Sequence, residues 1–339
     1  MKKKNLLIIF TGGTFSMKID TETGGAVPHF SGEELLDLMP DVRESAQIES
    51  FDFGKFPGPH MTPDLMMKLS HTVNSFLAMK KYDGIIITHG TDTLEETAYL
   101  LDLTINNPIP VVLTGSMKNS SEPDWDGPRN LMDSIQICLL ENSVNIGVLV
   151  CLNGEVNAAA EVQKTHTEDI ETFRSLDFGS LGIVDRGRVF YNRLPRKLEY
   201  IETDSIEPSV DLIKCYAGMN DKFFRYSVDS GAKGLVVEAM GVGNVPPPAF
   251  SGIEYAVQKG VPVVLVSRCP AGETLSIYGY PGAGKWLKGL GVIFADYLNG
   301  QKARIKLMLL LSKTRDPKVL DDLFDEKPGS LIPYKRKII

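Results

Sequence analysis

The stretch Leu6-Leu7-Ile8-Ile9-Phe10 runs directly into Thr11-Gly12-Gly13-Thr14, and Ile85-Ile86-Ile87-Thr88 runs in the same way into His89-Gly90-Thr91-Asp92-Thr93. Runs this apolar are typical of strands that are covered on both faces of a parallel sheet. Each run ends in a loop that carries hydroxyl groups, and open α/β sheets bind ligands at the carboxyl ends of their strands. We therefore expect the two loops to face each other across a crevice and to supply a nucleophile, its activator and an acid.

Strand-like runs alternate with helix-like segments through the first half of the chain. Ser31-Gly32-Glu33-Glu34 has the spacing of a capping box, and Thr62-Pro63 places an N-cap before a proline at the first helical position. The predicted strands are residues 6–10, 85–88, 111–114 and 146–152. Two helices are predicted at residues 33–39 and 94–103. Two more are predicted to begin at Thr62 and at Asp126-Gly127-Pro128. This order is typical of βαβ units around a mostly parallel sheet.

The alternation fades near residue 190 and resumes after residue 210. The segment Asn192–Pro208 is polar and contains prolines, which is typical of a linker. Beyond it we predict strands at 212–215, 235–238 and 261–266, a helix at 248–259, and helices at 302–311 and 317–324. The expected fold is α/β, with a larger N-terminal domain (1–190), a linker (191–211) and a smaller C-terminal α/β domain (212–339).

The composition limits the class of protein. Of 339 residues, 43% are hydrophobic and 23% are charged, as in ordinary globular proteins, and the net charge of −7 argues against a nucleic-acid or anionic-membrane partner. No run approaches the roughly 18 apolar residues of a membrane span. The apolar run after Lys2-Lys3-Lys4 is too short for a secretory signal, and the four cysteines are widely spaced. We expect a cytoplasmic protein with buried thiols at Cys138 and Cys151.

Each motif also has a simpler structural interpretation. Thr11–Thr14 could be a plain turn or a dinucleotide fingerprint, but the G-x-G-x-x-G pattern is absent. In the second loop, Thr91 or Asp92 could cap a helix whose first turn contains Glu95 and Glu96. By default, His89 would be a core histidine and Lys164 a solvated surface lysine.

The run Gly279-Tyr280-Pro281-Gly282-Ala283-Gly284-Lys285 matches the spacing of a phosphate-binding loop. Trp286 follows where that loop requires serine or threonine, and no apolar strand leads into Gly279. We interpret the match as coincidental and the segment as a glycine-rich loop. No histidine or cysteine cluster has metal-ligand spacing, so no metal is expected.

Taken together, the motifs resemble those of the bacterial-type L-asparaginase family in order and spacing. They are Thr11–Thr14, His89–Thr93, Thr114-Gly115-Ser116 with Asp126-Gly127-Pro128, and Lys164, with further similarity at Gly241–Asn244 and Gln301–Arg304. The resemblance spans nearly the whole chain, and the lack of a recognisable secretory signal leads us to expect the cytoplasmic branch of the family. It implies a two-domain α/β enzyme without a cofactor, acting on a small amide as a homodimer or homotetramer.

The resemblance also implies roles for individual residues. Thr14 would attack the side-chain amide carbonyl to give an acyl-enzyme, and Lys164 would take a proton through Thr91, with Asp92 holding Lys164 or the substrate ammonium. This is chemically reasonable because a threonine hydroxyl is a weak nucleophile without an adjacent base. The implied substrate-binding residues are Gly13, Gly58, Pro59, His60, Gly90, Ser116 and Asn244.

Two departures from the family pattern stand out. Ala26 occupies the place of the family's loop tyrosine, so Tyr278 or Tyr280 would have to replace it, from the same or a neighbouring subunit. Gly58-Pro59-His60 lacks the hydroxyl and the acid of the family motif that binds the substrate's α-carboxylate. A missing hydrogen bond to an ionic group costs about 1.5–3 kcal/mol, so we expect weak or altered handling of asparagine.

Three functional hypotheses follow. The first is an amidohydrolase that acts on asparagine or on a related amide, such as an N-substituted asparagine or glutamine. The second is a non-catalytic subunit that binds an amino acid or passes ammonia to a partner. The third, a nicotinamide-dependent oxidoreductase, conflicts with the missing fingerprint.

Overall fold

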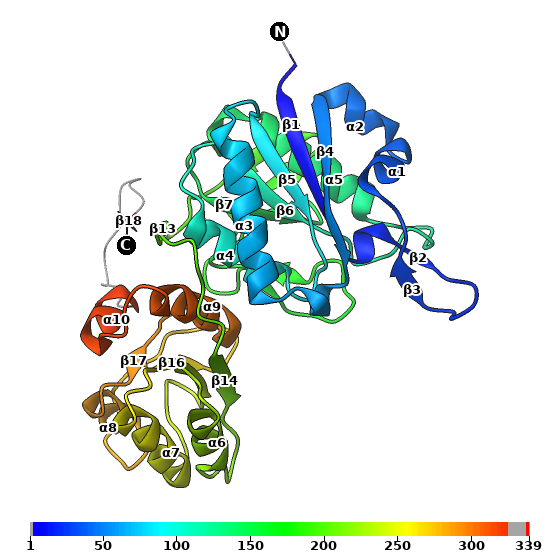
Figure 1. Cartoon of the computed structure of the whole chain (residues 1–339). Coiled ribbons are helices and arrows are strands. Elements are labelled where there is room, and N and C mark those ends of the chain that lie inside the picture. The colour runs from blue at the N-terminus through cyan, green and yellow to red at the C-terminus, as the bar shows by residue number, and fades with distance from the viewer. Residues whose placement is uncertain (1–2, 325–336, 339) are drawn as a thin grey trace. The chain divides into compact units, whose positions relative to one another are not determined.

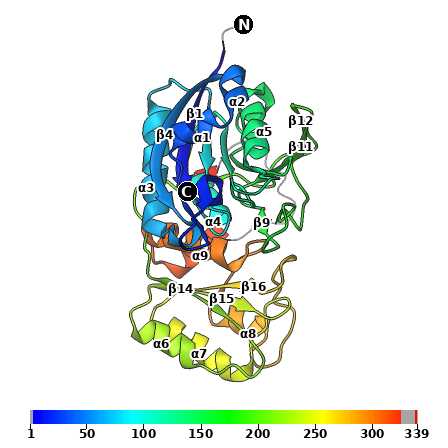
Figure 2. The same ribbon diagram turned by 90° about the vertical axis from the view of Figure 1, so that its right-hand side faces the viewer.

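The computed structural model describes residues 3–324 and 337–338, and it divides the chain into two compact units that adjoin in sequence at Tyr200 and Ile201. Figures 1 and 2 show the two units in perpendicular views. Each unit has its own sheet and its own hydrophobic core. The fold is therefore α/β with a larger and a smaller unit, as the sequence predicts.

The first unit is built on an eight-stranded sheet in the order β12-β11-β8-β7-β6-β5-β1-β4. Its strands are β1 (Asn5–Gly12), β4 (Gln47–Phe56), β5 (Gly84–Thr88), β6 (Val111–Thr114), β7 (Val148–Leu152), β8 (Glu155–Ala158), β11 (Gly182–Asp185) and β12 (Arg188–Tyr191). The pairs from β4 through β7 are parallel, and β8, β11 and β12 add an antiparallel margin. β5, β6 and β7 are buried along their whole length because helices cover both faces of the sheet.

The helices that pack on this sheet in the described part of the unit are α1 (Gly32–Asp37), α2 (Pro40–Ser45), α3 (Pro63–Ala78), α4 (Leu94–Thr104) and α5 (Gly127–Leu139). Figure 2 shows α3 and α5 on opposite sides of the sheet. The capping box at Ser31 is present, and Thr62 caps α3 by accepting the Leu65 N–H, so both predicted helix starts are confirmed. The predicted caps of α4 are wrong. The N-cap is Thr93, and its side chain does not cap the helix because its hydroxyl bonds elsewhere.

Several short elements lie at the carboxyl edge of the sheet. They are η1 (Thr14–Ser16), the hairpin of β2 (Met17–Ile19) and β3 (Ala26–Pro28), η2 (Gly58–His60), and the hairpin of β9 (Gln163–Lys164) and β10 (Phe173–Arg174). Elsewhere in the unit lie η3 (Glu141–Ser143) and β13 (Glu199–Tyr200), which pairs with β18 (Lys337–Ile338). The elements at the carboxyl edge carry several of the predicted site residues.

The second unit has a four-stranded parallel sheet in the order β14-β15-β16-β17. Its elements are β14 (Val210–Lys214), α6 (Lys222–Asp229), β15 (Gly234–Ala239), α7 (Pro247–Gln258), β16 (Val263–Ser267), α8 (Gly284–Gly289), β17 (Ile293–Phe294), α9 (Gly300–Leu311) and α10 (Pro317–Phe324). The glycine-rich run ends in the short helix α8, and Trp286 lies half-exposed on it. No helix of residues 3–324 is both long and apolar enough to cross a membrane.

Candidate active site

The parallel register brings the two threonine loops to one edge of the sheet. Phe10 of β1 pairs with Thr88 of β5, so the loops that follow these residues leave the sheet at the same level. Gly13 has φ +73°, and a Cβ placed on it would lie 2.4 Å from the Gly90 Cα. Only glycine fits there, because the two loop backbones are in direct contact. The predicted juxtaposition of the two motifs is therefore present.

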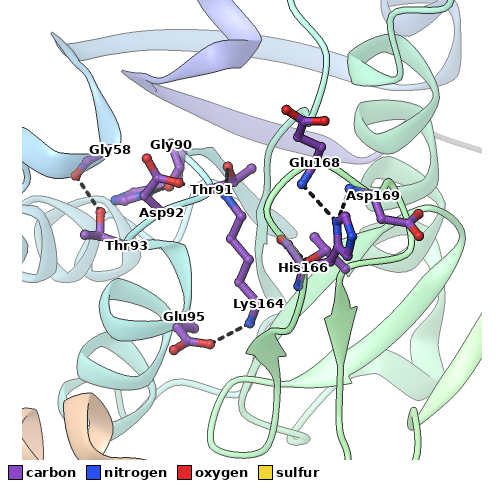
Figure 3. Close-up of polar contacts among 12 residues, drawn as sticks. Gly58, Gly90, Thr91, Asp92, Thr93, Glu95, Lys164, His166, Glu168 and Asp169 are labelled. Carbon is purple, nitrogen blue, oxygen red and sulfur yellow. Dashed lines mark hydrogen bonds and ion pairs between the residues drawn. The ribbon is translucent and has the colours of Figure 1, made fainter. Parts of the chain in front are cut away.

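A third loop joins them from η2. A Cβ on Gly90 would lie 2.7 Å from the Gly58 Cα, and the Thr93 hydroxyl donates a hydrogen bond of 2.7 Å to the Gly58 carbonyl (Figure 3). Gly58 is buried, whereas Pro59 and His60 are exposed. The three loops thus meet backbone to backbone, and Pro59 and His60 are open to solvent.

Lys164 reaches the second threonine loop from the β9–β10 hairpin. Its Nζ donates hydrogen bonds to Thr91 Oγ1 at 3.0 Å and to Asp92 Oδ1 at 2.7 Å. The Lys164 side chain is 17% exposed and that of Asp92 is 57% exposed, while Thr91 is buried. An ion pair with so exposed a carboxylate adds little stability, about 0–1 kcal/mol, so its main effect is to fix the amino group beside the Thr91 hydroxyl. That contact is the geometry that proton exchange requires.

Thr14 begins η1 directly after Gly13. It is half-buried, whereas the next residue, Phe15, is fully buried and packs edge-on against Trp125 with ring centroids 5.7 Å apart. This packing fixes the turn on which Thr14 lies.

His89 is a core histidine, as its simpler interpretation predicts. Nδ1 donates to the Gly90 carbonyl at 2.8 Å, and Nε2 accepts the Thr97 hydroxyl at 2.9 Å. Burial lowers the pKa of His89 to about 4, so the ring is neutral at physiological pH. It supports the Gly90 carbonyl and, through it, the loop that carries Thr91.

Ser116 is also part of the support. It is fully buried, and its hydroxyl contacts Asp126 Oδ1 at 2.7 Å and the Lys118 carbonyl. These contacts tie the loop after β6 to the start of α5. The Ser116 hydroxyl is thus engaged within the protein rather than directed to solvent.

The remaining predicted residues belong to the second unit. The main chain of Asn244 pairs with that of Met240 in an isolated antiparallel β-bridge. The buried Oδ1 of Asn244 has no hydrogen-bond partner in the part of the chain that the structure describes. Tyr278 and Tyr280 are exposed and stack on each other at 5.8 Å between ring centroids. Within the first unit, by contrast, the structure gathers Gly13, Thr14, Gly58, Pro59, His60, Gly90, Thr91, Asp92 and Lys164.

Residues 3–324 and 337–338 contain no group of three or more histidine, cysteine, aspartate or glutamate side chains placed to hold a metal ion. Cys138 and Cys151 are buried free thiols, as predicted, and burial raises the pKa of both well above the usual value.

Comparison with known proteins places this geometry in a family. The family model described as "Asparaginase, N-terminal" matches residues 5–197, and the one described as "Glutaminase/Asparaginase C-terminal domain" matches residues 209–324. The chain belongs to the asparaginase family. This confirms the resemblance drawn from the sequence motifs.

Individual asparaginase relatives agree with that assignment. An L-asparaginase of Bacillus licheniformis is 34% identical over 92% of this chain and 97% of its own length. The crystal structure of a probable cytoplasmic L-asparaginase from Campylobacter jejuni superposes with a TM-score of 0.86 at 32% identity, covering 95% of this chain and 99% of that one. The chain is thus an asparaginase-like amidohydrolase at the level of the family.

The family similarity also extends to an amidotransferase. One subunit of the glutamyl-tRNA(Gln) amidotransferase of Methanobrevibacter smithii is 31% identical over 93% of this chain and 73% of its own length. The same fold therefore occurs in a protein that is named as part of a larger enzyme.

One residue of the site has no signal in the sequence that would predict its contact. Glu95 accepts a hydrogen bond from the main chain of Lys164, whereas the sequence indicates only a favourable place in a helix first turn. The two residues are 69 positions apart, so nothing local in the sequence marks them as partners.

Proposed function

We propose that the protein hydrolyses the side-chain amide of L-asparagine, or of a closely related amide, through an acyl-enzyme on Thr14. The observation that carries the proposal is the contact of Lys164 with Thr91 and Asp92, on a loop whose backbone touches that of Gly13. The names of the asparaginase relatives support the same chemistry.

The residues suit a two-step reaction. The Thr14 oxygen attacks the amide carbonyl, and its proton passes by way of the Thr91 hydroxyl to the Lys164 amine, which accepts it in its neutral form. The C–N bond breaks, and the leaving nitrogen takes up the proton that Lys164 had accepted. Ammonia departs, and the acyl group remains as an ester on Thr14. Water then attacks the ester, returns a proton to the Thr14 oxygen and releases the acid. Main-chain N–H groups near Thr14 and Thr91 would stabilise the oxyanion.

Removal of the nucleophile tests this assignment. Thr14→Ala should lower ammonia release by roughly 10³-fold or more, because no covalent step remains. Thr14→Ser keeps a hydroxyl and should retain part of the activity. Wild-type turnover by folded Thr14→Ala would refute the role of Thr14. If the wild-type protein releases ammonia from none of the amides tested, the proposed function is refuted.

We further propose that the substrate preference departs from that of plain asparagine. Gly58-Pro59-His60 offers no hydroxyl and no carboxylate, and Asp92 is already paired with Lys164. A panel of asparagine, glutamine and N-substituted relatives, assayed by ammonia or amine release, should give a higher kcat/KM for an amide other than asparagine. His60→Ala should change the ranking if the imidazole contacts the substrate.

A second candidate function is supply of ammonia or binding of an amino acid in a larger assembly. It is favoured by the similarity to a protein named as an amidotransferase subunit. Measuring the melting temperature with added amino acids, together with ammonia release, distinguishes this candidate from the amidohydrolase. Stabilisation without turnover by the isolated chain would favour the second candidate.

We propose a homodimer or homotetramer in the cytoplasm. The name of the Campylobacter jejuni protein, a probable cytoplasmic L-asparaginase, supports the compartment. Light scattering after size exclusion, and fractionation of cells that express the full chain, test the two statements separately.

A further inference from the structure

The Lys164 hairpin is short. β9 and β10 pair at Lys164 with Phe173 and at Gln163 with Arg174, and beyond this ladder the Thr165 main-chain N–H donates to the Thr172 carbonyl at 2.8 Å. A lysine side chain is long and flexible, so a small displacement of its backbone would move the amino group away from Thr91. The hairpin bonds join β9 to β10, so the 3.0 Å contact between Nζ and the Thr91 hydroxyl also depends on a support that holds the hairpin beside α4.

Glu95 supplies that support. Its Oε2 accepts the main-chain N–H of Lys164 at 2.8 Å, as Figure 3 shows. Glu95 is only 4% exposed and lies in the first turn of α4, shortly after Thr91 in the chain. A buried carboxyl group is costly unless it is hydrogen-bonded, and the helix N-terminus favours its negative charge.

The bond ties the amine and its partners to one rigid element. The loop entering α4 carries Thr91 and Asp92, and Glu95 on the same helix fixes the backbone of Lys164. All three groups are then positioned relative to α4, which is buried along nearly its whole length.

We infer that Glu95 is a positioning residue for the proposed amidohydrolase: it sets the place of the Lys164 amine beside Thr91 through the Lys164 main chain and does not itself touch substrate. The inference rests on the proposed function for its kinetic consequence, but the placement of the amine can be measured without turnover.

The chain offers a matched control on the same helix. Asp102 is 3% exposed, lies near the end of α4, and accepts the main-chain N–H of Val148 at 2.9 Å. Asp102→Ala therefore removes the same kind of bond from a buried acid of the same helix, away from Lys164. Its effect on folding serves as the reference for Glu95→Ala.

The experiment compares Glu95→Ala, Glu95→Gln and Asp102→Ala as folded full-length proteins. We expect Glu95→Ala to lower kcat by about tenfold to a hundredfold with KM little changed, the range that a displacement of about 1 Å produces. Glu95→Gln keeps an acceptor oxygen and should recover most of the loss. Asp102→Ala should retain the wild-type kcat per folded molecule.

A second readout follows the amine itself. Lys164 is acylated with acetic anhydride at fixed pH, and the labelled peptide is quantified by mass spectrometry. Glu95→Ala should react several times faster than wild type because its amine is released, and Asp102→Ala should not. Equal labelling in Glu95→Ala and wild type, or equal losses of kcat in Glu95→Ala and Asp102→Ala, would overturn the inference. If the wild type is inactive but Glu95→Ala is still labelled faster, the proposed function is overturned and the positioning role of Glu95 stands.

Discussion

At the scale of single residues, the burial of His89 makes stability depend on pH. Its pKa is about 4 in the folded protein against 6.5 for a free imidazole, so the folded state binds fewer protons between these values. The stabilisation is fully present above pH 6.5 and is lost as pH falls toward 4. At pH 5 the wild type should have lost about 2 kcal/mol through this group.

His89→Gln tests the pH effect because a glutamine side chain can still donate to Gly90 and accept from Thr97. The variant should lose less unfolding free energy than wild type between pH 7 and pH 5, by the amount assigned to the histidine. Denaturant unfolding at both pH values measures the difference. Parallel losses in the two proteins would contradict the assignment.

Asp133 on α5 contributes a pH dependence of stability that is opposite in sign to that of His89. Burial raises its pKa from 3.8 to about 6, its Oδ2 has no hydrogen-bond partner among the described residues, and Arg129 Nε lies 3.8 Å away. The folded state binds more protons between pH 3.8 and 6, so stability falls as pH rises through this window.

Asp133→Asn should therefore stabilise the protein at pH 7.5 by roughly 2–3 kcal/mol, and the gain should vanish near pH 4. Thermal or denaturant unfolding at the two pH values measures it, with the exposed Asp185→Asn as a control. A gain of the same size at both pH values would show that the carboxylate charge is not the cause.

At the scale of elements, the site depends on the close approach of three loops. A Cβ on Gly90 would lie 2.7 Å from both the Cα and the N of Gly58, which are backbone atoms that cannot rotate away. Gly90→Ala should push the loops apart, cost about 1–3 kcal/mol of stability and abolish ammonia release. Gly289→Ala, which has no atom within 4 Å of the new methyl group, serves as the control. Activity retained in Gly90→Ala would contradict this packing.

The elements that can be predicted from sequence are those whose environment is uniform. β5 and β6 are wholly buried and form unbroken apolar runs, and the start of α3 follows from local capping chemistry. β4 has no such signal because it is an edge strand in which no residue is fully buried, so its ten residues carry no apolar run.

In the site, too, only features with a local sequence signal could be predicted. The place of the threonine loops after buried strands predicts their juxtaposition, and the family resemblance implies the roles of Thr91, Asp92 and Lys164. Taken alone, Lys164 resembles any surface lysine, because its neighbours Gln163 and Thr165 form no signal of their own. Contacts between Lys164 and Glu95 arise only when distant segments fold together, so no local pattern could predict them.

At the scale of the whole molecule, the candidate residues divide between the two units. Thr14 and its neighbours belong to the first, and Tyr278 and Tyr280 belong to the second. Ala26 stands where the family resemblance implies a tyrosine, and the sequence predicts that the hydroxyl of Tyr278 or Tyr280 replaces it. In a homo-oligomer that hydroxyl can come from the same chain or from another copy.

Mixing two inactive variants distinguishes these sources. One chain carries Thr14→Ala, and the other carries Tyr278→Phe together with Tyr280→Phe; each should be nearly inactive alone. If the tyrosine comes from another copy, dissociated and reassembled equal mixtures should regain about a quarter of the wild-type activity, because mixed dimers contain one intact site. If it comes from the same chain, mixing restores nothing, since every chain with Thr14 lacks the tyrosines. Full activity of the double tyrosine variant alone would remove both residues from the mechanism and leave Thr14 dependent on Thr91 and Lys164.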